Sequence, residues 1–121
     1  SMSTLNVANV TDGTTSVPTG YVVNGSCKVW NNIKQTGTQA IQDSFNVSSI
    51  ADTAVGFTTT TFTSAMNNNV YSITACCEYN SMQGLNTALS STTTVGIANL
   101  NSGGSYEDRD DTSIQIMGDL A

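Results

Sequence analysis

Acidic side chains gather near the C-terminus of the chain and are the first candidates for chemistry. The group consists of Glu107, Asp108, Asp110, Asp111 and, further along, Asp119. Ca²⁺ binds several oxygen ligands on a flexible loop, so a calcium site is one interpretation. The spacing of an EF-hand is absent, however, and Arg109 lies inside the group, where it repels a cation. The pattern favours a solvated loop that also protects a sheet edge with charge, and we expect no metal site.

Catalytic side chains are scarce. The chain has no histidine, which excludes a Ser/His/Asp triad and a Cys/His pair. Glycoside cleavage by two carboxylates needs a cleft, and only Asp43 and Glu78 are expected to be partly buried acids. Cys27, Cys76 and Cys77 occur without a CxxC motif, which favours small buried hydrophobic residues with reduced thiols over a metal or redox centre. We therefore expect no catalytic residues, no enzyme activity and no cofactor.

Trp30 is the single tryptophan of the chain and a candidate for binding. In a strand, period-two alternation puts it on a polar face together with Lys28, Asn32 and Lys34. An exposed indole beside amide and ammonium groups can stack on a sugar ring. The same residue also suits a subunit interface, where tryptophan is enriched, or a second packed layer of the same chain. The sequence leaves these three interpretations open.

Tyr106 is the second binding candidate, because an aromatic ring with a hydroxyl can stack and hydrogen-bond at a small entropic cost. It lies in a polar loop over residues 101–111, next to Glu107 and Asp108. Residues 80–91 are expected to form a second long loop. Loops at the ends of a scaffold often carry the function. We therefore predict a binding surface that includes Tyr106, Glu107 and Asp108.

The elements that position these residues are predicted to be β-strands. Threonine, serine, asparagine and glycine are abundant, charged residues make up 10% and there is one proline, a composition that disfavours helices. The clearest pattern is a hairpin within residues 26–50, with Gly37 in its turn and with Ile41, Phe45 and Val47 on one face of its second strand. Further strands are expected over residues 5–10, 21–24, 57–63 and 70–79, with a last strand pair over 95–100 and 113–117. Seven or eight such strands predict an all-β, antiparallel β-sandwich.

The length of 121 residues predicts one sandwich domain over residues 21–121, with residues 1–20 as an N-terminal arm or edge strand. A net charge of −6 without a basic run argues against a nucleic-acid partner. No apolar stretch approaches the ~20 residues of a membrane helix, and no signal peptide is recognisable. We expect a protein that is made in a cytoplasm and does not insert into a membrane.

The sequence VVNGSCKVWNNI, followed by GTQAIQDSFNVSSIAD and FTSAMNNNVYSI, resembles a short β-domain of tail fibres and virion appendage proteins from marine and enteric bacteriophages. In that family an NGSxKxW strand precedes the SFNVSSI core, and the last hairpin corresponds to NSGGSYEDRDDTSIQIMG. The resemblance covers roughly residues 22–118, and SFNVSSI is its most specific part. The chain departs from the family at Asn31, where the family has an apolar residue.

The resemblance implies a virion protein of the tail or an appendage, synthesised in the host cytoplasm. It also implies a homotrimer, as is general for tail fibres, in contact with other tail proteins of the virion. The expected function is attachment, with loops presented to a receptor on the host surface, in particular a glycan. Two alternatives stay open, a decoration or adaptor protein of the virion without its own receptor and a carbohydrate-binding module, because one β-scaffold serves all three.

Overall fold

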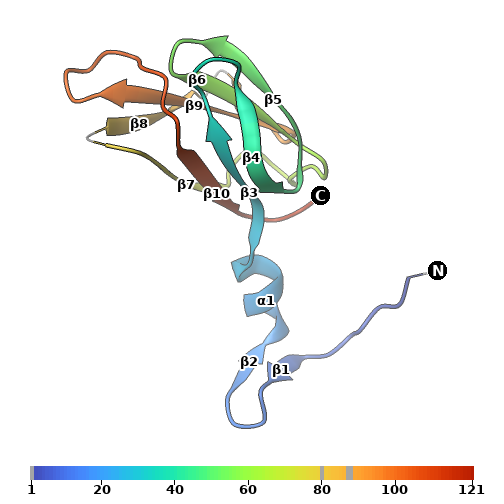
Figure 1. The fold of residues 1–121 in the computed structure, drawn as a ribbon. Helices are drawn as coiled ribbons and strands as arrows, with labels where there is room; N and C mark the ends of the chain where they lie inside the picture. Colours follow the sequence, from blue (N-terminus) through green and yellow to red (C-terminus); the bar gives the residue numbers. More distant parts are fainter. Residues whose placement is uncertain (1, 80, 87–88) are drawn as a thin grey trace.

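The computed structural model describes residues 2–79, 81–86 and 89–121. Two four-stranded antiparallel sheets pack face to face, and a small hairpin and a short helix precede them (Figure 1). The first sheet contains, in spatial order, β4 (Ala40–Phe45), β3 (Cys27–Lys34), β10 (Thr112–Met117) and β7 (Ser72–Cys77). The second contains β5 (Val47–Ala54), β6 (Phe57–Phe62), β9 (Thr94–Asn101) and β8 (Ser81–Asn86). The predicted all-β sandwich is confirmed, with ten strands in the described part of the chain.

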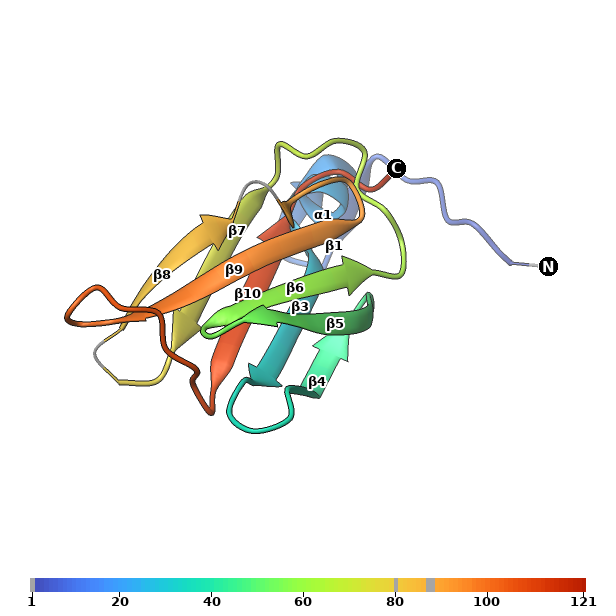
Figure 2. The same ribbon diagram turned by 90° about the horizontal axis from the view of Figure 1, so that it is seen from above.

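The core lies between the two sheets, whose strands cross one another in Figure 2. Its buried side chains come from the inward faces of both sheets and comprise Val29, Ile33, Phe62, Met66, Val95, Ile97, Ile114 and Ile116. Burying a side chain of this size stabilises the fold by about 1.5–3 kcal/mol. The alternation predicted for residues 70–79 is confirmed in β7, where Ile73 and Ala75 turn toward the core. The prediction that the cysteines are buried is wrong for Cys76, which alternation places on the exposed face of this strand.

The predicted β3–β4 hairpin is confirmed, with Gly37 in its turn at a φ of 67°. One extra residue, Gln42, forms a β-bulge where β4 pairs with β3. The bulge reverses the alternation along β4, so that Ile41 packs against the core while Phe45 is exposed. The prediction that Ile41 and Phe45 share one face is therefore wrong. Phe45 instead lies opposite Trp30 on the outer face of the first sheet.

Asn46 marks the corner where the chain passes from the first sheet to the second. Its φ of 58° is left-handed, a conformation that asparagine tolerates better than most residues. Its side-chain amide accepts a hydrogen bond from Ser64 N at 2.7 Å and donates to Lys28 O at 3.0 Å. β5 starts directly after this corner and continues to Ala54, beyond the end of the hairpin expected within residues 26–50.

The last two strands belong to different sheets, so the prediction that residues 95–100 and 113–117 form a pair is wrong. β9 pairs with β6 and β8, whereas β10 pairs with β3 and β7. Both are inner strands, and five consecutive residues of β9 are buried. Alternation within a strand shows which face is buried, but it does not show which strand lies beside it.

A buried polar network closes the end of the sandwich where the loop of residues 101–111 returns. Gln35 is fully buried, and its side-chain amide donates to Gly56 O at 2.9 Å and to Thr58 Oγ1 at 3.0 Å. Its Oε1 accepts hydrogen bonds from Asn99 Nδ2 at 2.8 Å and from Arg109 N at 3.1 Å. Gly56 has a φ of 77°, and a Cβ there would lie 2.6 Å from Asn99 O. The base of the loop is thereby fixed to the sandwich.

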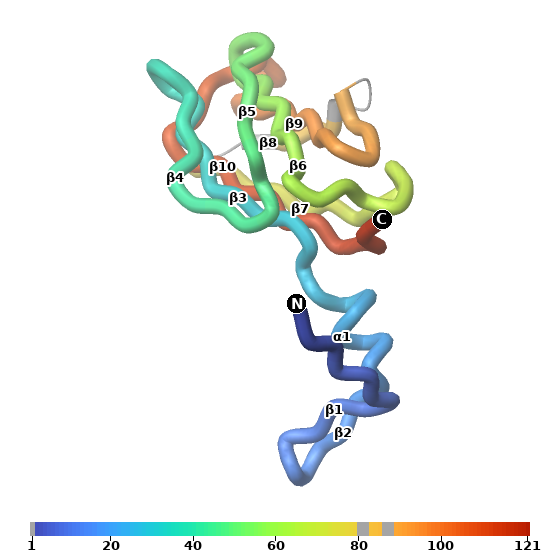
Figure 3. The backbone as a smooth tube through the Cα atoms, turned by 90° about the vertical axis from the view of Figure 1, so that its right-hand side faces the viewer, coloured from blue at the N-terminus to red at the C-terminus, as the bar shows by residue number. Residues whose placement is uncertain are grey.

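Residues 2–25 form an arm that projects from the sandwich (Figures 1 and 3). It contains the hairpin of β1 (Asn9–Thr11) and β2 (Ser16–Pro18), followed by α1 (Thr19–Gly25). The prediction of a strand at residues 21–24 is wrong, since α1 occupies them, and the strand expected at residues 5–10 is reduced to β1. α1 buries none of its residues. Among the described residues, no helix is long and apolar enough to span a membrane.

Candidate functional site

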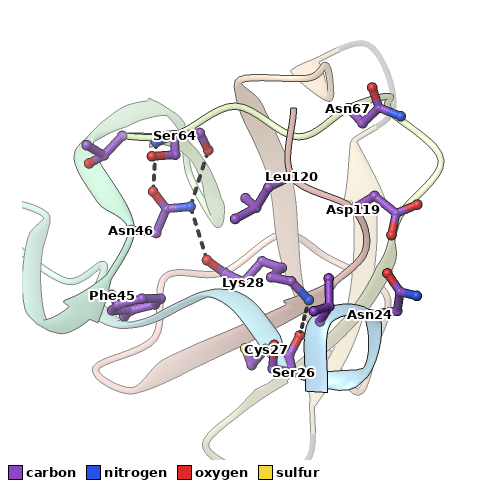
Figure 4. Close-up of a pocket in the computed structure, with 12 residues that line it drawn as sticks. Asn24, Ser26, Cys27, Lys28, Phe45, Asn46, Ser64, Asn67, Asp119 and Leu120 are labelled. Atoms are coloured by element: carbon purple, nitrogen blue, oxygen red, sulfur yellow. Dashed lines mark hydrogen bonds between the residues drawn. The ribbon is translucent and has the colours of Figure 1, made fainter. Parts of the chain in front are cut away.

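A pocket of about 940 Å³ opens where the arm joins the sandwich (Figure 4). The end of α1, the start of β3, the corner after β4 and the C-terminal segment form its walls. Amide, hydroxyl and apolar groups make up most of the lining, and its charged residues are Lys28 and Asp119. Asn67 N donates to Asp119 O at 2.7 Å, which attaches the C-terminal segment to the sandwich beside the pocket.

Lys28 extends across this pocket in Figure 4. Only 8% of the residue is exposed, and its Nζ donates a hydrogen bond to Ser26 O at 2.7 Å. An ammonium group has three donors, and in the described part of the chain Ser26 is the one partner of Nζ and no carboxylate lies within ion-pair distance. A buried ammonium is costly without acceptors. The pocket therefore favours a ligand with negative charge or several oxygen atoms.

Lys28 does not share the outer face with Trp30, contrary to the expectation from alternation. The pairing between β3 and β10 shifts at this point, since Val29 pairs with Ile116 and Cys27 with Met117. Lys28 is the extra residue of this second β-bulge, which turns its side chain from the sheet face toward the pocket.

Trp30 lies on the outer face of the first sheet, 36% exposed, and no further sheet covers that face in the described residues. Its cross-strand partner Phe45 lines the pocket. The two aromatic residues therefore connect the outer face with the pocket. Asn32 also lies on this face, but its amide is occupied, because Nδ2 donates to Asp111 Oδ1 at 2.7 Å and to Ser113 Oγ at 3.0 Å.

The loop of residues 101–111 lies at the opposite end of β3, next to Gln35. Tyr106 packs on Phe57 with ring centroids 4.6 Å apart, and about half of the tyrosine is exposed. Asp108 Oδ1 accepts a hydrogen bond from the backbone of the β5–β6 turn at 2.7 Å. Glu107 forms an ion pair of 3.3 Å with the guanidinium of Arg109. Both carboxylates thus hold the loop in place, and Tyr106 keeps an open surface.

The other acidic side chains of this loop each have a hydrogen-bond partner of their own. Asp110 accepts a hydrogen bond from the hydroxyl of Thr36, and Asp111 accepts one from Asn32. Among the described residues, no three His, Cys, Asp or Glu side chains come close enough together to hold a metal ion.

The binding residues predicted from the sequence thus fall in separate places. Lys28 lies in the pocket, and Trp30 and Asn32 lie on the adjoining outer face. Tyr106, Glu107 and Asp108 lie at the far end of the sandwich. The expected loop over residues 80–91 contains β8 instead, while residues 80, 87 and 88 lie outside the described part. Phe45 was missed as a pocket residue because the bulge that turns it outward leaves no sequence signal.

The arrangement of the pocket suits binding. Sugars and similar polar ligands are recognised by amide and hydroxyl groups together with an aromatic wall, which Asn24, Asn67 and Phe45 supply here. Two groups with shifted pKa values lie elsewhere. Hydrogen bonds from the backbone of Thr15 and Thr14 lower the pKa of Asp12, and burial raises the pKa of Tyr71.

Comparisons of the chain with protein-family models, with curated proteins and with solved structures found no match.

Proposed function

We propose that this protein is a tail-fibre-like virion appendage of a bacteriophage, which attaches to a glycan on the host surface. The observation that carries the proposal is the Lys28 side chain, largely buried and with Ser26 O as the one partner of its Nζ among the described residues, in a pocket with an aromatic wall. The phage context rests on the resemblance of the SFNVSSI region, which also supports a trimer in contact with other tail proteins. An appendage of this kind would present the same pocket several times to a cell surface, and repeated weak contacts produce strong overall binding.

Each group of the site has a defined role in this proposal. Phe45 and Trp30 provide apolar surface on which a sugar ring can stack. Lys28 donates to a negatively charged substituent, since a charge-assisted hydrogen bond is stronger than a neutral one. The ligand class is therefore a sugar that carries a carboxylate or a sulfate. Asp119, exposed and in the pocket lining, can accept hydrogen bonds from sugar hydroxyls.

The experiment is competition for adsorption. Purified protein should block adsorption of the phage that encodes it. Lys28→Met should abolish blocking because it removes the charge, while it keeps the aliphatic part of the side chain. Lys34→Met is the matched control, since Lys34 is exposed at the other end of the same strand. Circular dichroism confirms that both variants are folded. If wild-type protein does not block, the attachment proposal is wrong; if Lys28→Met blocks as well as Lys34→Met, the receptor site lies elsewhere.

A decoration or adaptor protein without its own receptor is the second candidate. The exposed apolar side chains of the arm favour it, because such a surface suits permanent contact with another virion protein. Immunogold labelling of virions tests both virion roles against a free carbohydrate-binding module, which would bind glycans without being part of the particle.

A further inference from the structure

The two sides of the sandwich differ in how they are closed. On one side the corner at Asn46 connects β4 directly with β5. On the other, β7 and β8 are the outermost strands of opposite sheets, and a groove of about 380 Å³ opens between them. None of its described lining residues is charged. Besides Gln83 and Gly84 they are Tyr71, Ile73, Ala75, Leu85 and Ile97.

The core is incompletely covered along this groove. Ala75 and Ile73 pair with Ile114 and Ile116 and face the core with them. Ile114 and Ile116 are 1% and 0% exposed, whereas Ala75 and Ile73 are only partly buried. Leu85, on the other wall, is 49% exposed. An additional extended segment with alternating apolar side chains would complete the core and pair with a sheet edge.

The chain carries such a segment at its N-terminus. Residues 2–7, MSTLNV, belong to no helix or strand, and Leu5 and Val7 alternate with Thr4 and Asn6. Leu5 and Val7 are both exposed. Within the described residues, the backbone of residues 2–6 forms no hydrogen bond, and Val7 O accepts one from the hydroxyl of Thr19. The segment therefore has an apolar face and free hydrogen-bonding groups.

We propose that residues 2–7 of one copy add as a strand in the β7–β8 groove of a second copy. The segment cannot be supplied by the same copy in the arrangement seen here, because the arm carries it to the side away from β7 and β8 (Figures 1 and 2). Six extended residues span about 20 Å, which is the length of a six-residue strand such as β7.

Charge also favours a second copy as the occupant. Each chain carries a net charge of −6, so two copies repel each other over most of their surface. Residues 2–11 contain no charged side chain, and neither does the lining of the groove. These are surfaces through which two acidic copies can meet. The contact is head-to-tail, and such contacts can close into rings; a ring of three would agree with the proposed trimer, although the inference does not depend on host attachment.

The first experiment measures the mass of the assembly by light scattering. At about 100 μM, where micromolar contacts are populated, wild-type protein should have a multiple of the chain mass of 12.6 kDa. Leu5→Asp should be monomeric, because it would place a charge in a groove whose described lining residues offer no opposite charge. Asn6→Asp is the matched control: it adds the same charge on the opposite face of the segment and should assemble like wild type. Monomeric wild-type protein, or assembly of Leu5→Asp equal to that of Asn6→Asp, would overturn the proposal.

The second experiment separates contact between arm and groove from contact between two arms. Leu85→Asp keeps the arm intact and places a charge in the groove; circular dichroism checks its fold. Leu5→Asp and Leu85→Asp should each be monomeric, and a mixture of the two should form heterodimers, since each supplies the part that the other lacks. A mixture of folded variants that stays monomeric contradicts the proposal, as does assembly of Leu85→Asp alone.

Discussion

Valines occur on both sides of Ser26, yet their surroundings differ completely. Val23 in α1 is 59% exposed, whereas Val29 in β3, six residues later, is 0% exposed. The difference is the second sheet, which covers Val29 and has no counterpart over the arm. A seven-residue helix without buried side chains is not stable by itself, since isolated helices need roughly 12–15 residues. The comparison teaches that the sandwich contains the contacts that stabilise it, whereas α1 buries none of its side chains against the sandwich.

The largest effect is expected in the sandwich core. Ile33→Ala should lower the free energy of unfolding by about 2–5 kcal/mol, because it leaves a cavity among fully buried neighbours. Val22→Ala in α1 is the matched control and should change it by less than about 0.5 kcal/mol. Urea unfolding followed by Trp30 fluorescence measures both. Equal effects of the two variants would show that the arm is packed in solution.

The second-largest effect on stability is expected at the corner formed by Asn46. Asn46→Ala should lower the free energy of unfolding by about 2–4 kcal/mol, because it removes three side-chain hydrogen bonds and forces alanine into a left-handed conformation. Asn46→Gly keeps the left-handed conformation accessible and isolates the loss of the hydrogen bonds, so its cost should be smaller. Thermal unfolding ranks the variants; an alanine variant as stable as the glycine variant contradicts a role for the backbone conformation.

Tyr71 provides a pH test of the sandwich. Its hydroxyl is bonded to Ser91 O and Thr94 O, both at 2.8 Å, and burial raises its pKa. A raised pKa means that the folded state favours the neutral phenol. The stability that the protonated Tyr71 contributes is therefore fully present below the usual tyrosine pKa of about 10, and it is lost as the pH rises through the higher pKa of the folded state. Stability of the wild type should therefore fall at alkaline pH. Tyr71→Phe should be less stable at pH 7 and show a smaller alkaline loss; parallel profiles would refute this.

The smallest effect is expected in the arm. Asp12 Oδ1 accepts hydrogen bonds from Thr14 N at 2.9 Å and from Thr15 N at 2.7 Å, and these lower its pKa. The ionised Asp12 carboxylate therefore stabilises the β1–β2 turn above the pKa that Asp12 has in the unfolded state. This stabilisation is lost as the pH falls through the lower pKa of the folded state. Asp12→Asn should speed hydrogen exchange at the amides of Thr14 and Thr15 and leave the melting temperature of the sandwich unchanged. A lower melting temperature would mean that arm and sandwich unfold together.

Much of the sandwich could be predicted from the sequence, because alternation directly reflects which face of a strand is buried. The hairpin around Gly37 and the inward face of β7 follow from this signal. Strand partners could not be predicted, since β10 lies between β3 and β7 and β9 pairs with β6, and all three of these neighbours are distant in the sequence. α1 was missed because Val22 and Val23, which are β-branched, are more typical of strands.

The candidate site was only partly predictable. Lys28 and Trp30 were identified by residue type, but the two bulges at Lys28 and Gln42 decide where Lys28 and Phe45 point. A bulge depends on how two strands are paired, and a single sequence does not contain that information. Tyr106 was correctly identified as an accessible aromatic residue, although it lies far from the pocket.

The way the loop of residues 101–111 is attached determines where this protein can tolerate new sequence. Its base cannot change freely, because Glu107 N lies 2.9 Å from where a Cβ of Gly56 would be and Arg109 N is bonded to Gln35. Its tip, residues 102–105, is exposed, and Asn101 Oδ1 organises it by accepting hydrogen bonds from the backbone of Gly103 and Ser105. Foreign peptides inserted within the tip should therefore be displayed on an unaltered scaffold, whereas insertions two or three residues beyond it should prevent folding.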